Sequence, residues 1–312
     1  MQQTQSPYLN LLITGCNGQV GYSIKQYLQQ QQYPEIKAIY TDRNSLDIAN
    51  PTKVRQMFEQ NPGINFVINT AAYTYVDKAE SEPELAFRIN TYAPQLLAQT
   101  CAQYGAWLLH LSTDFVFDGQ KTGPYLPTDT PNPLNIYGKT KLQGEQAVLA
   151  ANPNKTCVIR TSWVYANHGS NFVRTMLRLA TERPQLQVVN DQRGSPTYAP
   201  DLAQALITIC QQIGASNSHS YKIKPIYHYA NGGSCTWYEL AKTTLEYAQI
   251  NCPVIPIAAH QYPTPAKRPR NSQLDTTDIV NDFNIEIPNW KISLKKCIGS
   301  LKNGNLLSKT KT

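Results

Sequence analysis

The segment 135–145, NIYGKTKLQGE, places a tyrosine and a lysine four residues apart, as Tyr137 and Lys141. On a helix this spacing puts both side chains on one face, where the ammonium can bias the proton of the phenol. The same spacing occurs twice more, at Tyr33/Lys37 and at Tyr238/Lys242. Because the chain holds 19 tyrosines, spacing alone does not identify a catalytic pair.

The surroundings of the three tyrosines differ, and they favour Tyr137. A proline directly follows Tyr33, so no continuous helix can join that tyrosine to its lysine. Tyr238 lies in the second half of the chain beside a tryptophan, where we expect ordinary packing. Tyr137 opens a predicted helix, and the predicted strand before it runs into Thr113. A hydroxyl, a phenol and a lysine at one sheet edge form a proton-transfer set, so Thr113, Tyr137 and Lys141 are the candidate catalytic residues.

The elements that would position this set alternate along the first half of the chain. Short apolar runs read as buried strands at residues 8–14, 36–41, 64–70, 106–112 and 156–162. Between them, apolar residues follow helical spacing at residues 19–31, 51–61, 84–105 and 139–151. Asn50 can cap the second of these helices, and Pro51 suits its first turn. This alternation predicts an α/β fold with a doubly wound parallel sheet of the Rossmann type, which binds ligands at the carboxyl ends of its strands.

A glycine-rich turn follows the first predicted strand and opens the first predicted helix. Its spacing is G-x-x-G-x-x-G, with Gly15, Gly18 and Gly21. Glycines let the backbone approach a pyrophosphate, and the helix N-terminus then supplies amide donors and partial positive charge. We therefore expect a dinucleotide on this turn, bound by residues Gly15, Asn17, Gly18, Gln19, Val20 and Gly21.

The ends of the second and third predicted strands extend this cofactor site. Asp42 and Arg43 follow the second strand; the acid can accept from an adenosine ribose, and the arginine can pair with a 2′-phosphate. NADH and NADPH therefore both stay open. Asp47 could contact the adenine or cap the following helix. Beyond the third strand, small residues allow the dinucleotide to pass close to the strand end, so the site includes Ala71, Ala72 and Tyr73.

The second half of the chain shows a looser pattern. Helical spacing recurs at 171–182, 199–213 and 236–249, and 226–231 reads as a strand. We expect residues 1–165 to form an NAD(P)-binding domain, and residues 166–300 mainly a smaller, interleaved substrate-binding lobe. Residues 301–312 are polar and basic, and we expect a mobile tail there.

The composition of the chain limits the classes of ligand and partner that we expect. The 312 residues are 41% apolar, which allows a substantial core, and carry a formal net charge of +7. The positive charges are spread along the chain without a basic helix or arm that interleaves aromatics, so we expect no nucleic-acid binding and favour a phosphate-bearing small molecule. No apolar run reaches the roughly 20 residues of a membrane-spanning helix, and the first eight residues are polar and uncharged, so we expect no signal peptide there.

Cysteine and histidine usage suggests a reducing compartment and no metal centre. The seven cysteines contain no C-x-x-C pair, and the five histidines show no ligand spacing. We therefore expect a cytoplasmic protein without a bound metal or a membrane partner. The sequence leaves open whether the chain forms a homodimer.

A family resemblance covers roughly residues 9 to 275. It is carried, in order, by TGCNGQVG, NTAAYTYVDKAESE, STDFVFDG, PNPLNIYGKTKLQGE, RTSWVYA, NFVRTMLRLA and DQRGSPT. These motifs resemble the extended short-chain dehydrogenase/reductases and, within them, the dTDP-4-dehydrorhamnose reductase family. The resemblance implies NADPH- or NADH-dependent reduction of the C4 ketone of dTDP-4-dehydrorhamnose to dTDP-L-rhamnose, for cell-surface polysaccharide.

The resemblance also implies roles for individual residues. Tyr137 would donate a proton to the C4 oxygen, Lys141 would supply positive charge and hold the nicotinamide ribose, and Thr113 would bind the ketone oxygen. Residues that would contact the nucleotide sugar are Thr74, Val76, Thr113, Trp163, Asn171 and Arg268. From the residues alone, the alternatives are core packing for Trp163, a helix cap for Asn171 and a solvated surface charge for Arg268.

The sequence departs from the family pattern at one position, and four alternative functions are to be compared with the one that the resemblance implies. Pro127 stands where the family usually carries an acidic residue, which leaves the sugar less defined than the reaction. A 4,6-dehydratase usually needs an Asp-Glu pair after the threonine, whereas Thr113 is followed by Asp114 and Phe115. An epimerase or a reductase for a related 6-deoxy sugar stays open, as does a non-catalytic NADP-binding regulatory subunit.

Overall fold

Six parallel strands form the central sheet, in the order β10-β5-β4-β3-β1-β2. The structure, a computed structural model, describes residues 8–215 and 223–303. The strands are β1 (Leu9–Thr14), β2 (Ile36–Thr41), β3 (Phe66–Asn69), β4 (Trp107–Thr113), β5 (Thr156–Thr161) and β10 (Ile226–Tyr229). The predicted α/β class with a doubly wound parallel sheet is therefore confirmed, and each predicted strand lies within two residues of its observed bounds.

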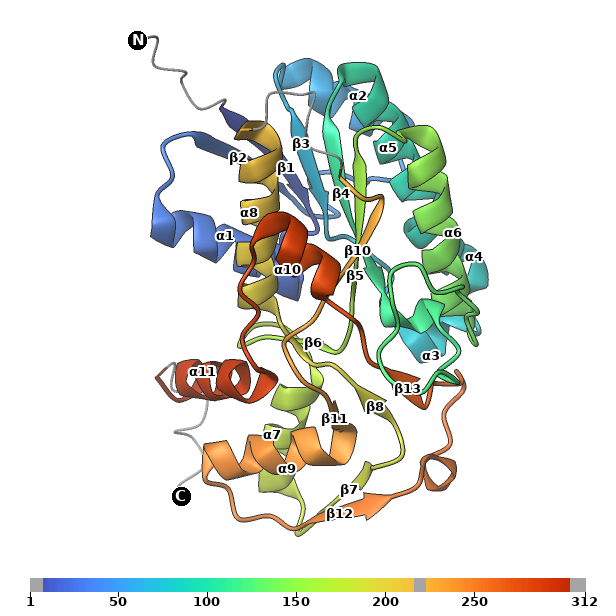
Figure 1. The fold of residues 1–312 in the computed structure, drawn as a ribbon, viewed down its shortest axis with the longest axis vertical. Coiled ribbons are helices and arrows are strands. Elements are labelled where there is room, and N and C mark those ends of the chain that lie inside the picture. The colour runs from blue at the N-terminus through green and yellow to red at the C-terminus, as the bar shows by residue number, and fades with distance from the viewer. Residues whose placement is uncertain (1–7, 216–222, 304–312) are drawn as a thin grey trace.

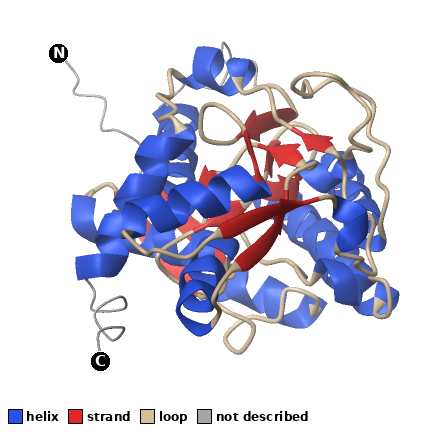
Figure 2. Ribbon diagram, turned by 90° about the horizontal axis from the view of Figure 1, so that it is seen from below, coloured by secondary structure: helices blue, strands red, loops and turns tan. Residues whose placement is uncertain are grey.

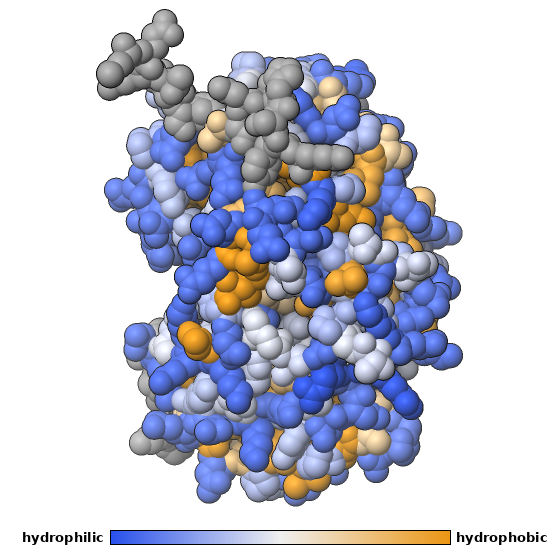
Figure 3. Space-filling view, in the orientation of Figure 1, coloured by the Kyte–Doolittle hydropathy of each residue, from blue (hydrophilic) through white to orange (hydrophobic). Residues whose placement is uncertain are grey.

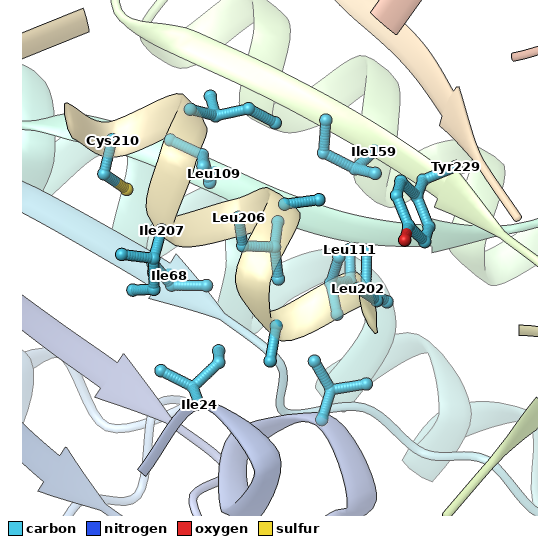
Figure 4. Packing of buried hydrophobic residues seen from close by; sticks show 14 of the residues in the cluster. Ile24, Ile68, Leu109, Leu111, Ile159, Leu202, Leu206, Ile207, Cys210 and Tyr229 are labelled. Carbon is cyan, nitrogen blue, oxygen red and sulfur yellow. The ribbon is translucent and has the colours of Figure 1, made fainter. Parts of the chain in front are cut away.

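Helices cover both faces of this sheet (Figures 1 and 2). On one face, α1 (Gln19–Gln31), α8 (Ala199–Ala215) and α10 (Thr277–Phe283) pack against the strands. On the other lie α2 (Pro51–Gln60), α5 (Ala93–Tyr104) and α6 (Ile136–Ala151). Successive side chains of a strand point to opposite faces of the sheet. Leu11 and Ile13 therefore lie in the core beneath α1, α8 and α10, whereas Leu12 lies in the core beneath α2, α5 and α6. Figure 4 shows the first core, where Leu202 and Leu206 of α8 lie among side chains of the sheet and of α1.

The segment predicted as a single helix at 84–105 is interrupted. It consists of α4 (Pro83–Phe87), a π-helical segment at Arg88–Tyr92, and α5. Pro94 has no amide hydrogen to give to the carbonyl one turn back, so the regular ladder cannot continue there. The side chain of buried Asn90 instead bonds the backbone of Tyr73 in both directions, at 2.9 and 3.1 Å. The widened turn thus ties this helix to the loop after β3.

A second layer of structure lies below the sheet in the view of Figure 1. It is built on α7 (Phe172–Glu182), α9 (Trp237–Ala248) and α11 (Trp290–Asn303), which share a separate apolar core. Short strand pairs complete it: β7 (Leu186–Val189) with β12 (Val254–Ile257), β6 (Val164–Tyr165) with β9 (Thr197–Tyr198), and β8 (Arg193–Gly194) between β11 (Cys235–Thr236) and β13 (Asn271–Ser272). This layer lies in the part of the chain where a second lobe is predicted, and its role in substrate binding stays a prediction.

The chain passes between the two layers more than once. β10, α8 and α10 come from the second half of the sequence but belong to the first sheet and its cover. Residues 301–303, expected to begin a mobile tail, instead form the end of α11, with Leu301 buried and the Lys302 ammonium donating to the Tyr247 carbonyl. The rest of that predicted tail, 304–312, lies outside the described residues.

The surface visible in Figure 3 is largely hydrophilic, and its apolar residues lie in separate groups. Within residues 8–215 and 223–303, no helix combines the length and apolar character that crossing a membrane requires. All seven cysteines carry free thiols.

Candidate active site

The order of the strands reverses between β1 and β3, and the glycine turn lies at this switch point. Gly15 has φ +70°, and a Cβ there would come within 2.8 Å of the Ala71 nitrogen that follows β3. At Gly21, a Cβ would come within 2.5 Å of the Gly15 carbonyl oxygen, so α1 packs directly on the turn. Gly18 precedes α1, and no side chain among the described residues caps the helix there. The first amides of α1 are therefore available to an anionic ligand.

A cavity of about 1030 Å³ opens from this turn along the carboxyl ends of the strands. This volume reaches the upper end of the range for small-molecule sites, so the cavity can hold an extended dinucleotide. The predicted residues that line it are Gly15, Asn17, Gly18, Gln19, Val20, Asp42, Arg43, Asp47, Ala71, Ala72, Tyr73, Thr74, Tyr137 and Lys141. Gly21 lies behind the lining and serves the packing of α1.

The acidic residues of the cofactor side are already hydrogen-bonded. One Asp42 carboxylate oxygen accepts from the Asn17 amide at 2.7 Å, and the other accepts from the Asn44 and Ser45 amides. The Ser45 bonds are the largest cause that holds the pKa of Asp42 below its usual value. Asp47 accepts from the Ala49 amide at 3.0 Å, whereas the cap of α2 is Asn50, as predicted. Asp42 is thus fixed at the rim of the cavity, beside Arg43.

Several lining residues were missed by the sequence prediction. Ser112 and Thr161 line the cavity from the ends of β4 and β5, and their place at strand ends is a signal that could have found them. Gly169 and Ser170 arrive from the segment before α7, for which no local signal exists. There the His168 ring stacks on Tyr22 of α1 with centroids 3.9 Å apart. The remaining additional lining residues are Asn44, Leu46, Ile48, Ala49, Thr70, Tyr75, Lys78, Glu82, Leu85, Arg88, Ile89, Leu111 and Val164.

Tyr137 stands at the start of α6, held by two local features. The Asn135 side chain caps the helix by accepting from the Gly138 amide at 2.8 Å. A Cβ at Gly138 would overlap the Phe115 carbonyl oxygen, so the first turn of α6 presses on the 3₁₀ turn Asp114–Val116 that follows β4. This close approach places Tyr137 beside Thr113. Burial raises the pKa of Tyr137 to about 12, while the Thr113 hydroxyl lowers it and the Asp114 charge raises it.

Lys141 lies one turn along α6 and is only 2% exposed. Its ammonium donates to the Leu111 carbonyl at 2.6 Å, and burial lowers its pKa to about 8, an effect opposed by Glu145. Glu145 in turn holds Arg160 through two bonds of 2.9 and 2.7 Å. Lys141 is not among the groups that shift the pKa of Tyr137, so its role as the electrostatic partner of the phenol stays a prediction.

The two other pairs lie elsewhere. Tyr33 follows the end of α1, where its hydroxyl lies 3.1 Å from that of Tyr27, and Lys37 is on β2. Tyr238 and Lys242 share α9, but neither lines the cavity. Of the three spacings, the one on α6 alone has both members in the cavity wall.

The residues expected to contact the sugar are scattered by comparison. Thr74 lines the cavity, whereas Val76 begins α3 (Val76–Ala79) outside the lining, and Thr113 is buried behind it. Trp163 stacks on Trp237 with centroids 3.5 Å apart.

Two of the expected sugar contacts are bonded to the protein itself. The Asn171 side chain caps α7 by accepting from the Arg174 amide, and its own amide donates to Ala166 and Gln19. The Arg268 guanidinium donates to both carboxylate oxygens of Asp77, at 3.0 and 2.8 Å. Arg268 is therefore ion-paired rather than a free surface charge. Within residues 8–215 and 223–303, no three His, Cys, Asp or Glu side chains gather to hold a metal ion.

Comparison with known proteins gives one consistent result. The model of the RmlD substrate binding domain family matches residues 9–303. A dTDP-4-dehydrorhamnose reductase of Sinorhizobium fredii is 40% identical over 297 residues, which cover 94% of this chain and 98% of the relative. The crystal structure of a dTDP-4-dehydrorhamnose reductase from Clostridium acetobutylicum has a TM-score of 0.86 at 37% identity, covering 94% of this chain and 100% of that one. A Bacillus anthracis dTDP-4-dehydrorhamnose reductase in complex with NADP has a TM-score of 0.84 at 35% identity, covering 94% and 99%. The chain belongs to the RmlD substrate binding domain family, among the dTDP-4-dehydrorhamnose reductases that its motifs resemble.

Proposed function

We propose that this protein reduces the C4 ketone of dTDP-4-dehydrorhamnose to give dTDP-L-rhamnose, a precursor of cell-surface polysaccharide. The observation that carries the proposal is that the glycine turn and the Tyr137–Lys141 pair line one cavity. Relatives of similar length carry this activity in their names. Seven free thiols agree with a reducing compartment, so we assign the reaction to the cytoplasm.

The cofactor in this proposal is NADPH or NADH, which when bound supplies the hydride that reaches C4. Two features suit a dinucleotide. The glycines of the turn leave open the space that a Cβ would occupy, and the uncapped amides of α1 would hold the pyrophosphate. Arg43 and the fixed Asp42 carboxylate would meet the adenosine end. The NADP in the Bacillus anthracis relative supports a dinucleotide in the same place.

The reacting sugar would lie against the start of α6. Tyr137 gives its phenolic proton to the C4 oxygen as that oxygen gains negative charge, and Thr113 orients the same oxygen. Because burial raises the pKa of Tyr137, the phenolate left behind needs a cation near it. Lys141, one helical turn away, would supply that charge once it leaves the Leu111 carbonyl to hold the nicotinamide ribose.

The rest of the substrate would extend away from the glycine turn. We propose Thr74 and Val76 as sugar contacts and Trp163, braced by Trp237, as a wall of the sugar pocket. Arg268 would meet the diphosphate, for which its planar fork is suited, by exchanging Asp77 for phosphate oxygens. Asn171 would act through the cap of α7 and its bond to Gln19.

The test is turnover of the named substrate. Purified protein is mixed with dTDP-4-dehydrorhamnose and either NADPH or NADH, while absorbance reports cofactor oxidation and the product configuration is determined. We expect oxidation and the L-rhamno product. Failure to oxidise either cofactor, at saturating substrate and with cofactor binding verified, would exclude the reductase. An L-talo product would instead identify a related 6-deoxy sugar reductase.

A further inference from the structure

Asp114 is a buried carboxyl directly behind the threonine of the proposed active site. It opens the 3₁₀ turn after β4 and is 2% exposed. One of its oxygens accepts from the Thr113 hydroxyl at 3.1 Å, and the Ser272 side chain of β13 lies close enough to lower the pKa of the carboxyl. Its Oδ2 is buried without a hydrogen-bond partner among the described residues. An ionised carboxylate held in this way is costly, so the burial of Asp114 disfavours its charged form.

The protonation state of Asp114 decides to which group the Thr113 hydroxyl can donate its hydrogen. The Thr113 hydroxyl already accepts from the Phe115 amide at 3.2 Å, and it has one hydrogen to give. An ionised carboxylate can only accept, so it takes that hydrogen. A protonated carboxyl can donate to the hydroxyl instead, which leaves the threonine hydrogen free for a ligand.

The surroundings of Asp114 stabilise its neutral form enough for both forms to be populated near pH 7. Burial raises the pKa of Asp114 to about 7, although bonds from Ser272 and Thr113 lower it. From α6, the titratable neighbour is Tyr137, whose pKa the Asp114 charge raises. From β13 the neighbour is neutral Ser272, and on its own turn the backbone amide of Phe115 faces it. Among the described groups that shift the pKa of Asp114, none is a cation.

We propose that Asp114 is a positioning residue that sets the direction of the Thr113 hydrogen bond. With the Asp114 carboxyl protonated, Thr113 donates to the ketone oxygen and helps to hold it for Tyr137. With Asp114 ionised, the threonine hydrogen is turned away and reduction slows. The proton that enters the product comes from Tyr137, so the Asp114 proton is retained through the turnover. The inference rests on the proposed reduction.

The first experiment compares pH profiles of kcat for the wild type and Asp114→Asn. The asparagine amide is a permanent donor to Thr113, as the protonated acid would be. We expect the wild type to lose about tenfold in kcat between pH 6 and 8, with a midpoint near the Asp114 pKa of about 7. In the variant the midpoint should move to about 8, where Lys141 titrates.

A matched control separates this effect from general damage. Asp118, four residues on, has its pKa held below the usual value by the Gln120 amide and the Asn132 side chain, so it is ionised throughout this range. Asp118→Asn should keep the wild-type midpoint whatever it does to the rate. An unchanged midpoint in Asp114→Asn would overturn the proposal.

A second readout does not depend on turnover. Infrared difference spectra of the free protein should contain a protonated carboxyl band at pH 6 that fades as the pH rises through about 7. The band should be missing in Asp114→Asn and present in Asp118→Asn. If the wild type turns over no substrate but shows the band, the proposed reduction fails while the protonation of Asp114 stands. If the band is missing at pH 6, the inference about Asp114 fails even in an active reductase.

Discussion

The proposed cofactor side and the proposed substrate side of the site are organised differently. On the cofactor side, the predicted residues converge on one cavity, and the amides of α1 lack a side-chain cap. On the substrate side, Asn171 and Arg268 are bonded to other parts of the protein, and Trp163 is stacked on Trp237. Parallel strands bring their carboxyl ends together whatever the loops do, so the first group is fixed by topology. The second group depends on tertiary contacts between segments that are far apart in the sequence.

The largest expected effect tests the centre of the cofactor side. Tyr137→Phe removes the proposed proton donor and should lower kcat about 10²- to 10⁴-fold, the range for loss of a general acid. Affinity for NADPH, measured by its fluorescence, should change less than about threefold, because the glycine turn remains.

The matched control for this prediction is Tyr238→Phe, which removes a phenol with the same lysine spacing from α9. That variant should keep the wild-type rate. Comparable loss in both variants would show that position in the cavity does not distinguish the pairs.

The second effect concerns the buried ion pair behind Lys141, which joins α6 to the sheet. Glu145 and Arg160 are both 2% exposed and joined by two hydrogen bonds, linking α6 to β5. Glu145→Gln leaves the arginine charge buried without its partner and should lower the free energy of unfolding by about 3–5 kcal/mol. Urea denaturation measures it. Glu182→Gln, which breaks the exposed Arg178 pair, should change that free energy by less than about 0.5 kcal/mol.

The third effect concerns the contribution of buried Lys141 to the stability of the free protein. Burial lowers the Lys141 pKa from 10.5 to about 8, so the charged form is disfavoured in the fold. Lys141→Met should therefore raise the unfolding free energy of the free protein at pH 7 by up to about 3 kcal/mol, at 1.36 kcal/mol per pKa unit. The same variant should lose the reductase activity.

The pH dependence of that gain follows from which state binds more protons. Between pH 8 and 10.5 the unfolded wild-type chain keeps the lysine proton while the folded chain releases it, so wild-type stability rises with pH. The advantage of Lys141→Met is thus complete below about pH 8 and disappears as the pH approaches 10.5. A constant advantage across this range would remove the buried charge as its cause.

The difference between the two sides corresponds to the difference between what the sequence could and could not predict. The strands and α6 follow from local periodicity, and the glycine turn follows from its place after β1. The sequence analysis missed the π-helical turn at Arg88–Tyr92. A proline inside an apolar pattern does not show at which residue the helical hydrogen-bond pattern changes. Gly169 and Ser170 were missed as well, since they reach the cavity through tertiary contacts of His168.

Arg268 illustrates the limit most clearly. Its type and motif indicated an anion contact, yet its partner Asp77 lies 191 residues away in the sequence. No local pattern encodes a contact of that separation. Likewise, Trp163 stacks on Trp237, which belongs to a distant segment of the chain. The local periodicity of either segment does not indicate this contact.

The fourth prediction examines whether Arg268 exchanges partners. If it moves from Asp77 to the substrate diphosphate, Arg268→Ala should raise KM for the nucleotide sugar about tenfold or more, as loss of a charge-assisted bond does. NADPH affinity should stay within about twofold of the wild type, because Arg268 does not line the cofactor cavity. Asp77→Asn removes the competing carboxylate and should not raise KM. Equal increases in KM in both variants would mean that the ion pair acts only as a structural link.

The smallest effect decides whether Asn171 belongs to the substrate side at all. As the cap of α7, its loss in Asn171→Ala should lower the unfolding free energy by about 1 kcal/mol. Asn50→Ala, which uncaps α2 far from the proposed sugar site, is the matched control and should lower it similarly. KM for the sugar should change less than about twofold in either variant, since a cap acts on the helix rather than on the ligand. A tenfold rise in KM confined to Asn171→Ala would instead make this amide a substrate contact, and the division between the two sides would have to be redrawn through α7.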